Sequence, residues 1–204
     1  MVNTSYNVRP DKHTTSEISA LNPEKGVIVY DTNLDVLKEY NGTAWAELRS
    51  ADTSGWASYN DTQYTSGSPF SLSALTDTAL PNNAGSKIES QMPSDIATFY
   101  NGTTITGRNG DNLDLQIYFK AIPSSANQWL EIWVDIGGAV GELYRATFAF
   151  PKGSGVERGI MYSLASSYTL GTWESNGGTV YVRSSAQTNI YDVVYNFDRS
   201  HKAR

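Results

Sequence analysis

Histidine is the side chain used most often in acid–base catalysis and in zinc binding, and this chain has only two. His13 lies near the start of the chain and His201 lies near its end. A Ser/His/Asp or Cys/His site would therefore have to be built from the two termini. Catalytic zinc needs three protein ligands, and the sequence contains no cysteine. The sequence thus predicts no catalytic residue, no metal site and no cofactor.

A pair of carboxylates is the other arrangement that could do chemistry, because glycosidases use two carboxyl groups about 5 to 9 Å apart. Glu131 and Asp135 lie on one face of a predicted strand, beside Trp129 and Trp133. A strand rises about 3.3 Å per residue, which puts their backbones about 13 Å apart. We therefore rank a glycan depolymerase below a non-enzymatic protein.

Two acidic loops have oxygen-rich sequences that could hold a cation. Residues 31–35 (DTNLD) match the first half of a calcium loop, but Val36 stands where such a loop needs glycine. Residues 109–112 (NGDN) precede a predicted strand. Turn formation accounts for every residue in both segments.

Composition excludes several classes of partner. The formal net charge is -6 and the 15 Lys and Arg residues are scattered, so no basic stripe could follow a phosphate backbone, and we expect no nucleic-acid partner. No apolar run approaches the roughly 18 residues of a membrane helix, so we expect no membrane insertion. The absence of cysteine removes disulfides as a source of stability.

The first part of the chain reads as an extended arm followed by a small β-meander. Residues 1 to about 20 lack periodicity, with a single helical turn near residues 16–21 as the one exception. Three short strands with tight turns are predicted over residues 26–48. So few apolar residues cannot form a free-standing core, and four of them predict a docking surface: Val27, Val29, Tyr40 and Trp45.

The rest of the chain predicts a β-sandwich. Residues 51–69 are polar and rich in Gly and Ser, which indicates a linker with a boundary near residue 55. Residues 70–204 contain short strand-like runs at regular spacing, typical of a jelly roll. Leu113, Leu115, Ile117 and Phe119 share one predicted buried face. Residues 129–136 are apolar on both faces, which predicts trimer-interface candidates at Trp129, Glu131, Trp133 and Asp135.

Two segments resemble known families. Residues 26–32 (GVIVYDT) and 37–45 (LKEYNGTAW) are similar to a short module of tailed-phage fibre and virion structural proteins. The C-terminal part resembles the jelly-roll knobs of trimeric phage head-fibre and tail-fibre proteins. Its ending, residues 194–204, is similar to endings of marine cyanophage structural proteins. The resemblance implies homotrimerisation, an N-terminal attachment region, a distal head, and a place in the virion after assembly in the cytoplasm of a bacterial host.

The expected fold is therefore all-β, with residues 1–50 as attachment region and residues 70–204 as a trimeric jelly roll. The leading hypothesis is a non-enzymatic capsid-decoration or fibre subunit whose partners are its own copies and other virion proteins such as capsid or tail. An alternative is a receptor-binding knob that recognises host surface polysaccharide through loop aromatics, for which the candidates are Tyr100, Tyr162, Tyr168 and Trp173. A depolymerase and a monomeric bacterial carbohydrate-binding module are further alternatives.

Overall fold

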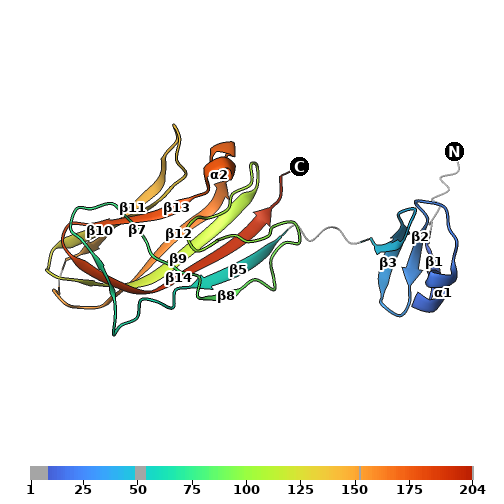
Figure 1. Ribbon diagram of the computed structural model, residues 1–204, viewed down its shortest axis with the longest axis horizontal. Coiled ribbons are helices and arrows are strands. Elements are labelled where there is room, and N and C mark those ends of the chain that lie inside the picture. Colours follow the sequence, from blue (N-terminus) through green and yellow to red (C-terminus); the bar gives the residue numbers. More distant parts are fainter. Residues whose placement is uncertain (1–8, 49–53, 152, 204) are drawn as a thin grey trace, which may run out of the picture. The chain divides into compact units, whose positions relative to one another are not determined.

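The computed structural model describes residues 9–48, 54–151 and 153–203. The chain divides into two compact units, residues 1–52 (unit 1) and residues 53–204 (unit 2). Each unit has its own sheets and its own buried residues, and each is described by itself below (Figure 1).

Unit 1 is one four-stranded sheet with one short helix. Its elements are β1 (Asp11–His13), α1 (Thr15–Ala20), β2 (Ile28–Asp31), β3 (Val36–Tyr40) and β4 (Trp45–Glu47). The strands lie in the order β1-β2-β3-β4, with β1 parallel to β2 and the other neighbours antiparallel. The predicted meander is thus joined by a fourth strand and a helix from the segment expected to be an arm. Residues 1–8 of that arm lie outside the described residues.

Local sequence explains why α1 begins where it does. The Thr14 hydroxyl accepts a hydrogen bond from the backbone N–H of Glu17, and the Glu17 carboxylate accepts one from the backbone N–H of Thr14. This reciprocal pair is a capping box, which satisfies donors that a helix start otherwise leaves free. The helix buries Ile18 on the face of the sheet that carries Val29 and Asp31.

Unit 2 is a two-sheet sandwich. One sheet has the order β12-β9-β14-β5-β8, with β6 also paired to β14, and the other has the order β11-β10-β13-β7 (Figure 1). The strands are β5 (Gly55–Asn60), β6 (Phe70–Leu72), β7 (Thr78–Ala79), β8 (Ser86–Ile88), β9 (Asn112–Pro123), β10 (Gln128–Asp135), β11 (Glu142–Phe150), β12 (Arg158–Tyr168), β13 (Thr179–Ser184) and β14 (Thr188–His201). A short helix, α2 (Gly171–Asn176), lies between β12 and β13.

The strand order of unit 2 is that of a jelly roll. With β6 and β8 set aside, eight strands remain, and the first pairs with the last while the second pairs with the seventh. The third and sixth strands extend the first sheet, and the fourth and fifth extend the second. Such a double-sheet arrangement of eight strands is the jelly-roll architecture. The all-β prediction, with a jelly roll as its main domain, is confirmed.

The core lies between the two sheets, and alternation along the strands determines what enters it. Leu113, Leu115, Ile117 and Phe119 of β9 are all buried, as the sequence predicts. They face buried residues of the second sheet, including Leu130, Ile132 and Val182. Because one side of each strand points inward, the alternation leaves a second, outward row on the β9 sheet.

The linker prediction for residues 51–69 is wrong over residues 55–60. These residues form β5, which pairs with the final strand from Gly55 opposite Arg199 to Asn60 opposite Val194. Ala57 and Tyr59 on this strand are buried in the core. Two anchors in a polar stretch were enough to make a strand, because β14 supplies its partner. Residues 51–53 lie outside the described residues.

Two irregularities interrupt the alternation of inward and outward side chains on β14 and β11. The register of β14 with β9 shifts between Tyr191 and Val194, where Asp192 has φ 53°. This shift turns Tyr191 away from the core, and its hydroxyl donates to Glu157. On β11, Tyr144 has φ 54° and its side chain is 58% exposed, so it does not share the buried face of Phe150.

Among the helices of the described residues, none is long and apolar enough to cross a membrane.

Candidate functional site

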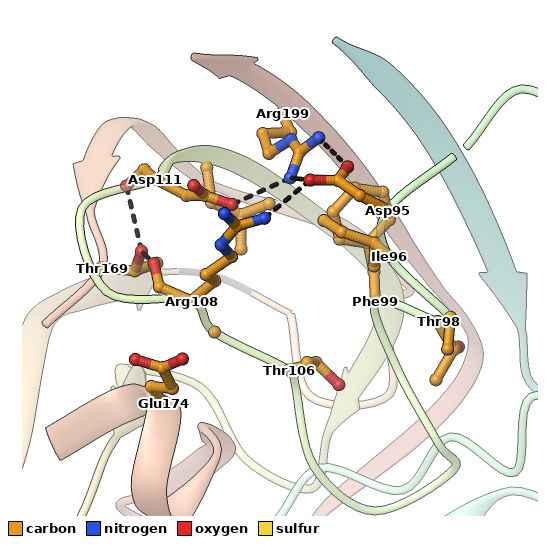
Figure 2. A pocket seen from close by; sticks show the side chains of 13 residues that line it. Asp95, Ile96, Thr98, Phe99, Thr106, Arg108, Asp111, Thr169, Glu174 and Arg199 are labelled. Atoms are coloured by element: carbon orange, nitrogen blue, oxygen red, sulfur yellow. Dashed lines mark hydrogen bonds and ion pairs between the residues drawn. The ribbon is translucent and has the colours of Figure 1, made fainter. Parts of the chain in front are cut away.

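A cavity of about 280 Å³ lies in unit 2, where the loop before β9, helix α2 and the end of β14 meet. Its wall is mainly apolar, with Ile96, Phe99 and Leu113, and charged side chains stand at its rim. Figure 2 shows Arg108 and Asp95 on one side of this cavity and Glu174 on the other. An apolar hollow with a few convergent polar groups is the usual form of a ligand site.

Helix α2 is held beside the cavity by Trp173. The indole is fully buried, and its Nε1 donates to the carbonyl oxygen of Ile105 at 3.1 Å. A Cβ atom at residue 107 would lie 2.3 Å from the ring, so only glycine fits there. The next residue, Glu174, is thereby placed at the rim, where its carboxylate accepts the N–H of Asn109 at 3.2 Å.

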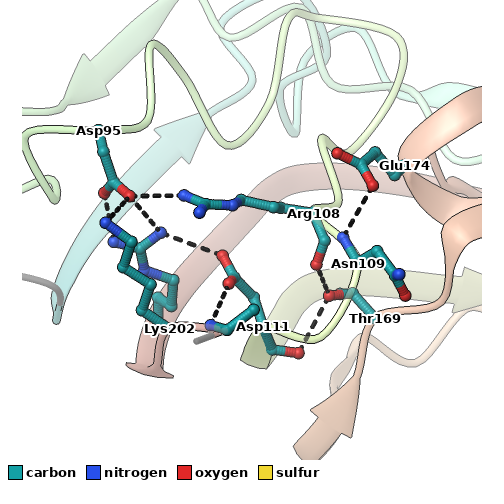
Figure 3. Close-up of polar contacts among 9 residues, drawn as sticks. Asp95, Arg108, Asn109, Asp111, Thr169, Glu174 and Lys202 are labelled. Carbon is teal, nitrogen blue, oxygen red and sulfur yellow. Dashed lines mark hydrogen bonds and ion pairs between the residues drawn. The ribbon is translucent and has the colours of Figure 1, made fainter.

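The loop of residues 108–111 is tied to the strand before α2. The backbone N–H of Thr169 donates to Asp111 at 3.0 Å, and the backbone N–H of Gly110 donates to Thr169 at 2.9 Å. The Thr169 hydroxyl also donates to the carbonyl oxygens of Arg108 and Asp111. These contacts fix the backbone from which the Arg108 side chain reaches Asp95 (Figure 3).

An ion-pair network lines one side of the cavity. The buried Arg199 guanidinium of β14 pairs with Asp95 and, at 3.0 Å, with Asp111. Asp95 also accepts from Arg108 at 2.6 Å and from Lys202 at 2.9 Å (Figure 3). Asp111 accepts the backbone N–H of Ala203 at 2.8 Å. The network therefore joins the loop before β9 to the last described residues of the chain.

Protonation in this network follows from its charges. Hydrogen bonds from Arg199 and Lys202 hold the pKa of the Asp95 carboxyl well below its usual range, although burial acts in the opposite direction. Burial opposes the charged form of Arg199, but hydrogen bonds to Asp95 and Asp111 outweigh it and raise the pKa of this guanidinium. Asp95 is consequently an ionised structural partner and not a proton donor at neutral pH.

The remaining hydrogen-bonding capacity of the cavity belongs to Arg108 and Glu174. Among the described residues, the Arg108 side chain makes one hydrogen bond, from Nη1 to Asp95. Its Nε and Nη2 donors therefore have no acceptor in this described part of the protein. Glu174 forms no ion pair within the same described part of the chain, and one of its carboxylate oxygens accepts only a backbone N–H. The cavity thus offers both donors and an acceptor beside an apolar wall.

A second feature of unit 2 is a broad uncovered surface on the outward side of the β9 sheet. We call it the open sheet face; register and burial define it. Trp56, Ile88 and Met161 on it are 43%, 47% and 63% exposed. Its remaining members are the half-buried or exposed residues Ser58, Gln116, Tyr118, Ser163, Val194 and Asn196. No member carries a charge.

Charged residues border the open sheet face. Asp114 and Asp198 are cross-strand partners at one end, where burial and the neighbouring Asp114 raise the pKa of the Asp198 carboxyl. Lys120 lies at the other end and pairs with Asp192 at 3.1 Å. Past Met161 the apolar surface continues into a groove between the unpaired edges of β11 and β12, which we call the edge groove: Tyr144, Ala146, Phe148, Met161 and Leu164.

The predicted trimer-interface candidates lie on β10, in the other sheet. The Trp133 ring stacks on Tyr181 with centroids 5.7 Å apart, and the Arg145 guanidinium lies 3.7 Å from its centroid. Arg145 also pairs with Glu131 at 2.7 Å, and Asp135 accepts the backbone N–H of Gly137 at 2.7 Å. The second face of this strand is thus largely covered within the chain, so its apolarity does not require a subunit. An interface role for these four residues stays a prediction.

Three of the four predicted glycan-stacking aromatics cannot have that role. Tyr100, Tyr162 and Trp173 are at most 4% exposed. The hydroxyl of Tyr100 donates to the carbonyl oxygen of Asn82, and that of Tyr162 to the carbonyl oxygen of Tyr144. They are core residues whose polar ends are hydrogen-bonded. Their position in the sequence alone does not distinguish a buried aromatic from an exposed one. Tyr168, which is 56% exposed, stays a candidate.

In unit 1 the predicted docking residues are divided. Val29 is 3% exposed beneath α1 and cannot contact a partner, whereas Val27 is 38% exposed. Tyr40 and Trp45 contact each other, with ring centroids 5.5 Å apart. The face of the sheet opposite α1 is uncovered, and Ile28 and Leu48 are each 42% exposed on it.

The two acidic loops contain no cluster of three or more metal-ligating side chains within the described residues. The Asp31 carboxylate instead accepts from Lys38 at 2.8 Å and from the Thr15 hydroxyl at 2.9 Å. Burial would raise its pKa, but Lys38, Thr15 and two backbone N–H groups outweigh burial and lower the pKa to about 2. Asp111 is similarly occupied by Arg199.

Comparison with known proteins gives no family for the chain. No family model matches it, and no curated protein matches it. Among solved structures, the chain is similar in fold to Eiger TNF from S. frugiperda, with a TM-score of 0.48, 10% identity, and coverage of 74% of this chain and 95% of that one.

Two virus-particle proteins are also among the similar structures. The vertex protein P5 of PRD1 gives a TM-score of 0.40 at 13% identity, with 72% of this chain and 97% of that one covered. A chain of the IBDV viral particle gives 0.34 at 11% identity, with 76% and 33% covered. At these values the likeness carries no argument about function, so the chain's own strand order establishes the jelly roll.

Proposed function

We propose that the chain is a non-enzymatic structural subunit of a bacteriophage particle, a decoration or fibre subunit. In this proposal unit 2 assembles as a homotrimer and unit 1 attaches to another virion protein such as capsid or tail. The observation that carries the proposal is the open sheet face. It supports assembly because the core of a protein interface is rich in aromatic and Met residues and poor in charged residues.

Self-association is the use of this face that the geometry favours. A ring of three copies requires each copy to present two different surfaces, since only a heterologous contact closes into a threefold ring. Unit 2 has two such surfaces, the open sheet face and the edge groove, which adjoin at Met161. Burying Met161 and Trp56 between copies would remove two exposed apolar side chains of the sheet from water.

Attachment to the particle is assigned to unit 1 because its sheet has one uncovered face. Ile18, Val29 and Asp31 are the buried residues of its described part, and so small a core is marginal without a partner. Ile28 and Leu48 supply apolar surface for that partner on the uncovered face. The predicted Tyr40 and Trp45 lie on the other face of the sheet, the one that carries Val29, and would add to a partner contact only at its edge. The phage-module resemblance of residues 26–45 supports the same assignment.

The proposal is tested by incorporation into particles. The full-length chain should sediment with purified particles of the phage that encodes it, and a chain without residues 1–50 should remain folded but stay in the supernatant. Circular dichroism of the shortened chain provides the folding control. Assembly of the shortened chain onto particles would refute the attachment role, and absence of the full-length chain from particles would refute the structural role.

A second candidate function, recognition of host surface polysaccharide by unit 2, is favoured by the cavity beside α2. Specific retention of unit 2 on host cells or on their polysaccharide would support it. This function is compatible with assembly as a trimer, because the cavity and the open sheet face are formed by different residues.

A further inference from the structure

We propose that the cavity beside α2 binds one pyranose unit of a neutral polysaccharide. In this arrangement Glu174 accepts hydrogen bonds from sugar hydroxyls and Arg108 donates to a sugar oxygen. The inference rests on the recognition function proposed above and gives it a site. It replaces the buried aromatics Tyr100, Tyr162 and Trp173, whose rings no sugar can reach.

The sign of the charges selects a neutral ligand. Arg108, at 40% exposure, would repel a cation that approached Glu174. Glu174 and the ionised Asp95 would repel an anion that approached Arg108. A molecule with both O–H donors and oxygen acceptors satisfies both groups without bringing a net charge into the cavity. Sugars have this mixed character on every carbon that carries a hydroxyl.

Shape and polarity agree with a sugar ring. The cavity of about 280 Å³ is at the small end of ligand sites, which suits a single ring and not an extended oligomer. Ile96 and Phe99 provide an apolar wall on the Asp95 side of the cavity, opposite Glu174 (Figure 2). A pyranose presents C–H groups on one face and hydroxyls at its edge, so it can cover such a wall while its edge reaches the polar rim.

The polar groups are also positioned in advance. Asp95 fixes one end of the Arg108 guanidinium, and Asn109 fixes one oxygen of Glu174. The buried Trp173 anchors the helix that carries Glu174. Groups that are held in place before binding lose little conformational entropy when the ligand arrives. The ion pairs of Asp95, Asp111 and Arg199 thus act as support for the site.

The test is saturation-transfer NMR on the full-length chain with glucose, galactose, mannose, rhamnose and N-acetylglucosamine at millimolar concentration. At least one of these sugars should receive saturation from the protein. Glu174→Gln keeps an oxygen acceptor for Asn109 but removes the charge, and it should weaken binding by about tenfold or more. Glu24→Gln, a matched change in unit 1, should leave binding unchanged.

A second variant covers the case in which the amide substitutes for the carboxylate. Ile96→Trp would fill the cavity and should abolish saturation transfer, with retained circular dichroism as its folding control. Transfer to none of the five sugars would overturn the inference. Equal binding by both variants and the original chain would also overturn it.

The polymer arm separates this inference from the function on which it rests. Host polysaccharide should be retained by the original chain and lost with Glu174→Gln. Retention that survives in both cavity variants would leave host recognition standing and refute the cavity as its site. Binding of a free sugar without any retention of host polysaccharide would support the cavity and refute host recognition.

Discussion

Unit 1 and unit 2 are both β structures, but different forces hold them together. Unit 2 has two sheets and buries a continuous apolar cluster between them. Unit 1 has one sheet and one six-residue helix, and among its described residues only Ile18, Val29 and Asp31 are buried. One of these three is a carboxylate. The small unit therefore depends on a polar junction, and the large unit depends on packing.

This difference has a functional counterpart. A unit with its own core can present a surface without help, whereas a single sheet with one bare face gains its stability from whatever it binds. The proposed assignment of unit 1 to attachment and unit 2 to presentation rests on that asymmetry. The following experiments change one unit and use the other as an internal reference.

The largest effect is expected from Trp173→Ala in unit 2. Removing a fully buried Trp from a core typically costs about 3–5 kcal/mol, and this indole also donates to Ile105. Urea unfolding, monitored by hydrogen exchange in peptides from each unit, should show that unit 2 is destabilised and unit 1 is unchanged. A loss below about 1 kcal/mol would contradict the role of Trp173 as the anchor of α2.

The next effect is the loss of unit 1 structure in Asp31→Asn. The carboxylate joins α1 to β3 through Thr15 and Lys38, and an amide cannot form the ion pair. Backbone hydrogen exchange over residues 9–48 should lose its protection while unit 2 keeps its own. Asp11→Asn, at an exposed position of β1, is the matched control and should have no such effect.

Acid should reproduce that result in the original chain. The pKa of Asp31 is lowered to about 2 in the fold, so its contribution to stability is present above the unfolded value, near 3.9. It is lost as pH falls from there toward the folded value. Protection of residues 9–48 should therefore decrease over this window, and the decrease should be smaller in the Asp31→Asn chain, in which the lowered pKa of Glu17 still contributes.

Alkali should act on unit 2 instead. Burial raises the pKa of Tyr59, Tyr100, Tyr162 and Tyr195, all of them in unit 2. The folded state keeps these hydroxyls protonated, so stability is full below the unfolded value of about 10 and is lost as pH rises above it. Tyrosinate absorbance should rise together with the loss of unit 2 circular dichroism. Early, non-cooperative ionisation of these tyrosines would contradict their burial.

The smallest effect is expected from Asp198→Asn at the border of the open sheet face. Because its pKa is raised, Asp198 destabilises the fold when it ionises beside Asp114, at pH values above the ordinary carboxyl pKa. At pH 7 the variant should be more stable by a few tenths of a kcal/mol, up to about 1. At a pH below the ordinary pKa of an aspartate, Asp198 is protonated, so both chains should unfold at the same urea concentration. A less stable variant at pH 7 would contradict the repulsion.

The sequence was sufficient for those parts of the fold that depend on local patterns. The alternation of Leu113, Leu115, Ile117 and Phe119 predicted the buried side of β9 because no irregularity interrupts it there. Such alternation does not hold at Tyr144 and Tyr191, where bulges turn the side chain over. Bulges arise from pairing with a neighbouring strand, and a single strand's sequence does not reveal them.

The candidate site could not have been predicted in the same way. Asp95, Arg108, Glu174 and Arg199 are far apart in the chain and belong to no motif. Only the jelly-roll topology brings the loop before β9, helix α2 and the end of β14 together. The sequence singles out Trp173 as a sugar-stacking candidate. Sequence position does not tell whether such an indole is exposed to a ligand or buried as an anchor. β5 was likewise hidden in a polar segment whose partner lies near the C-terminus.

The central claim is that unit 2 self-associates through its open sheet face. The solution mass of the protein tests it most directly. Light scattering should give three times the chain mass for the full-length protein and for residues 54–204. A variant of the full-length chain with Tyr118→Lys and Met161→Lys should be folded and monomeric, because these outward side chains leave the core intact. A monomeric original chain, or a variant that keeps the mass of three chains, would contradict the account.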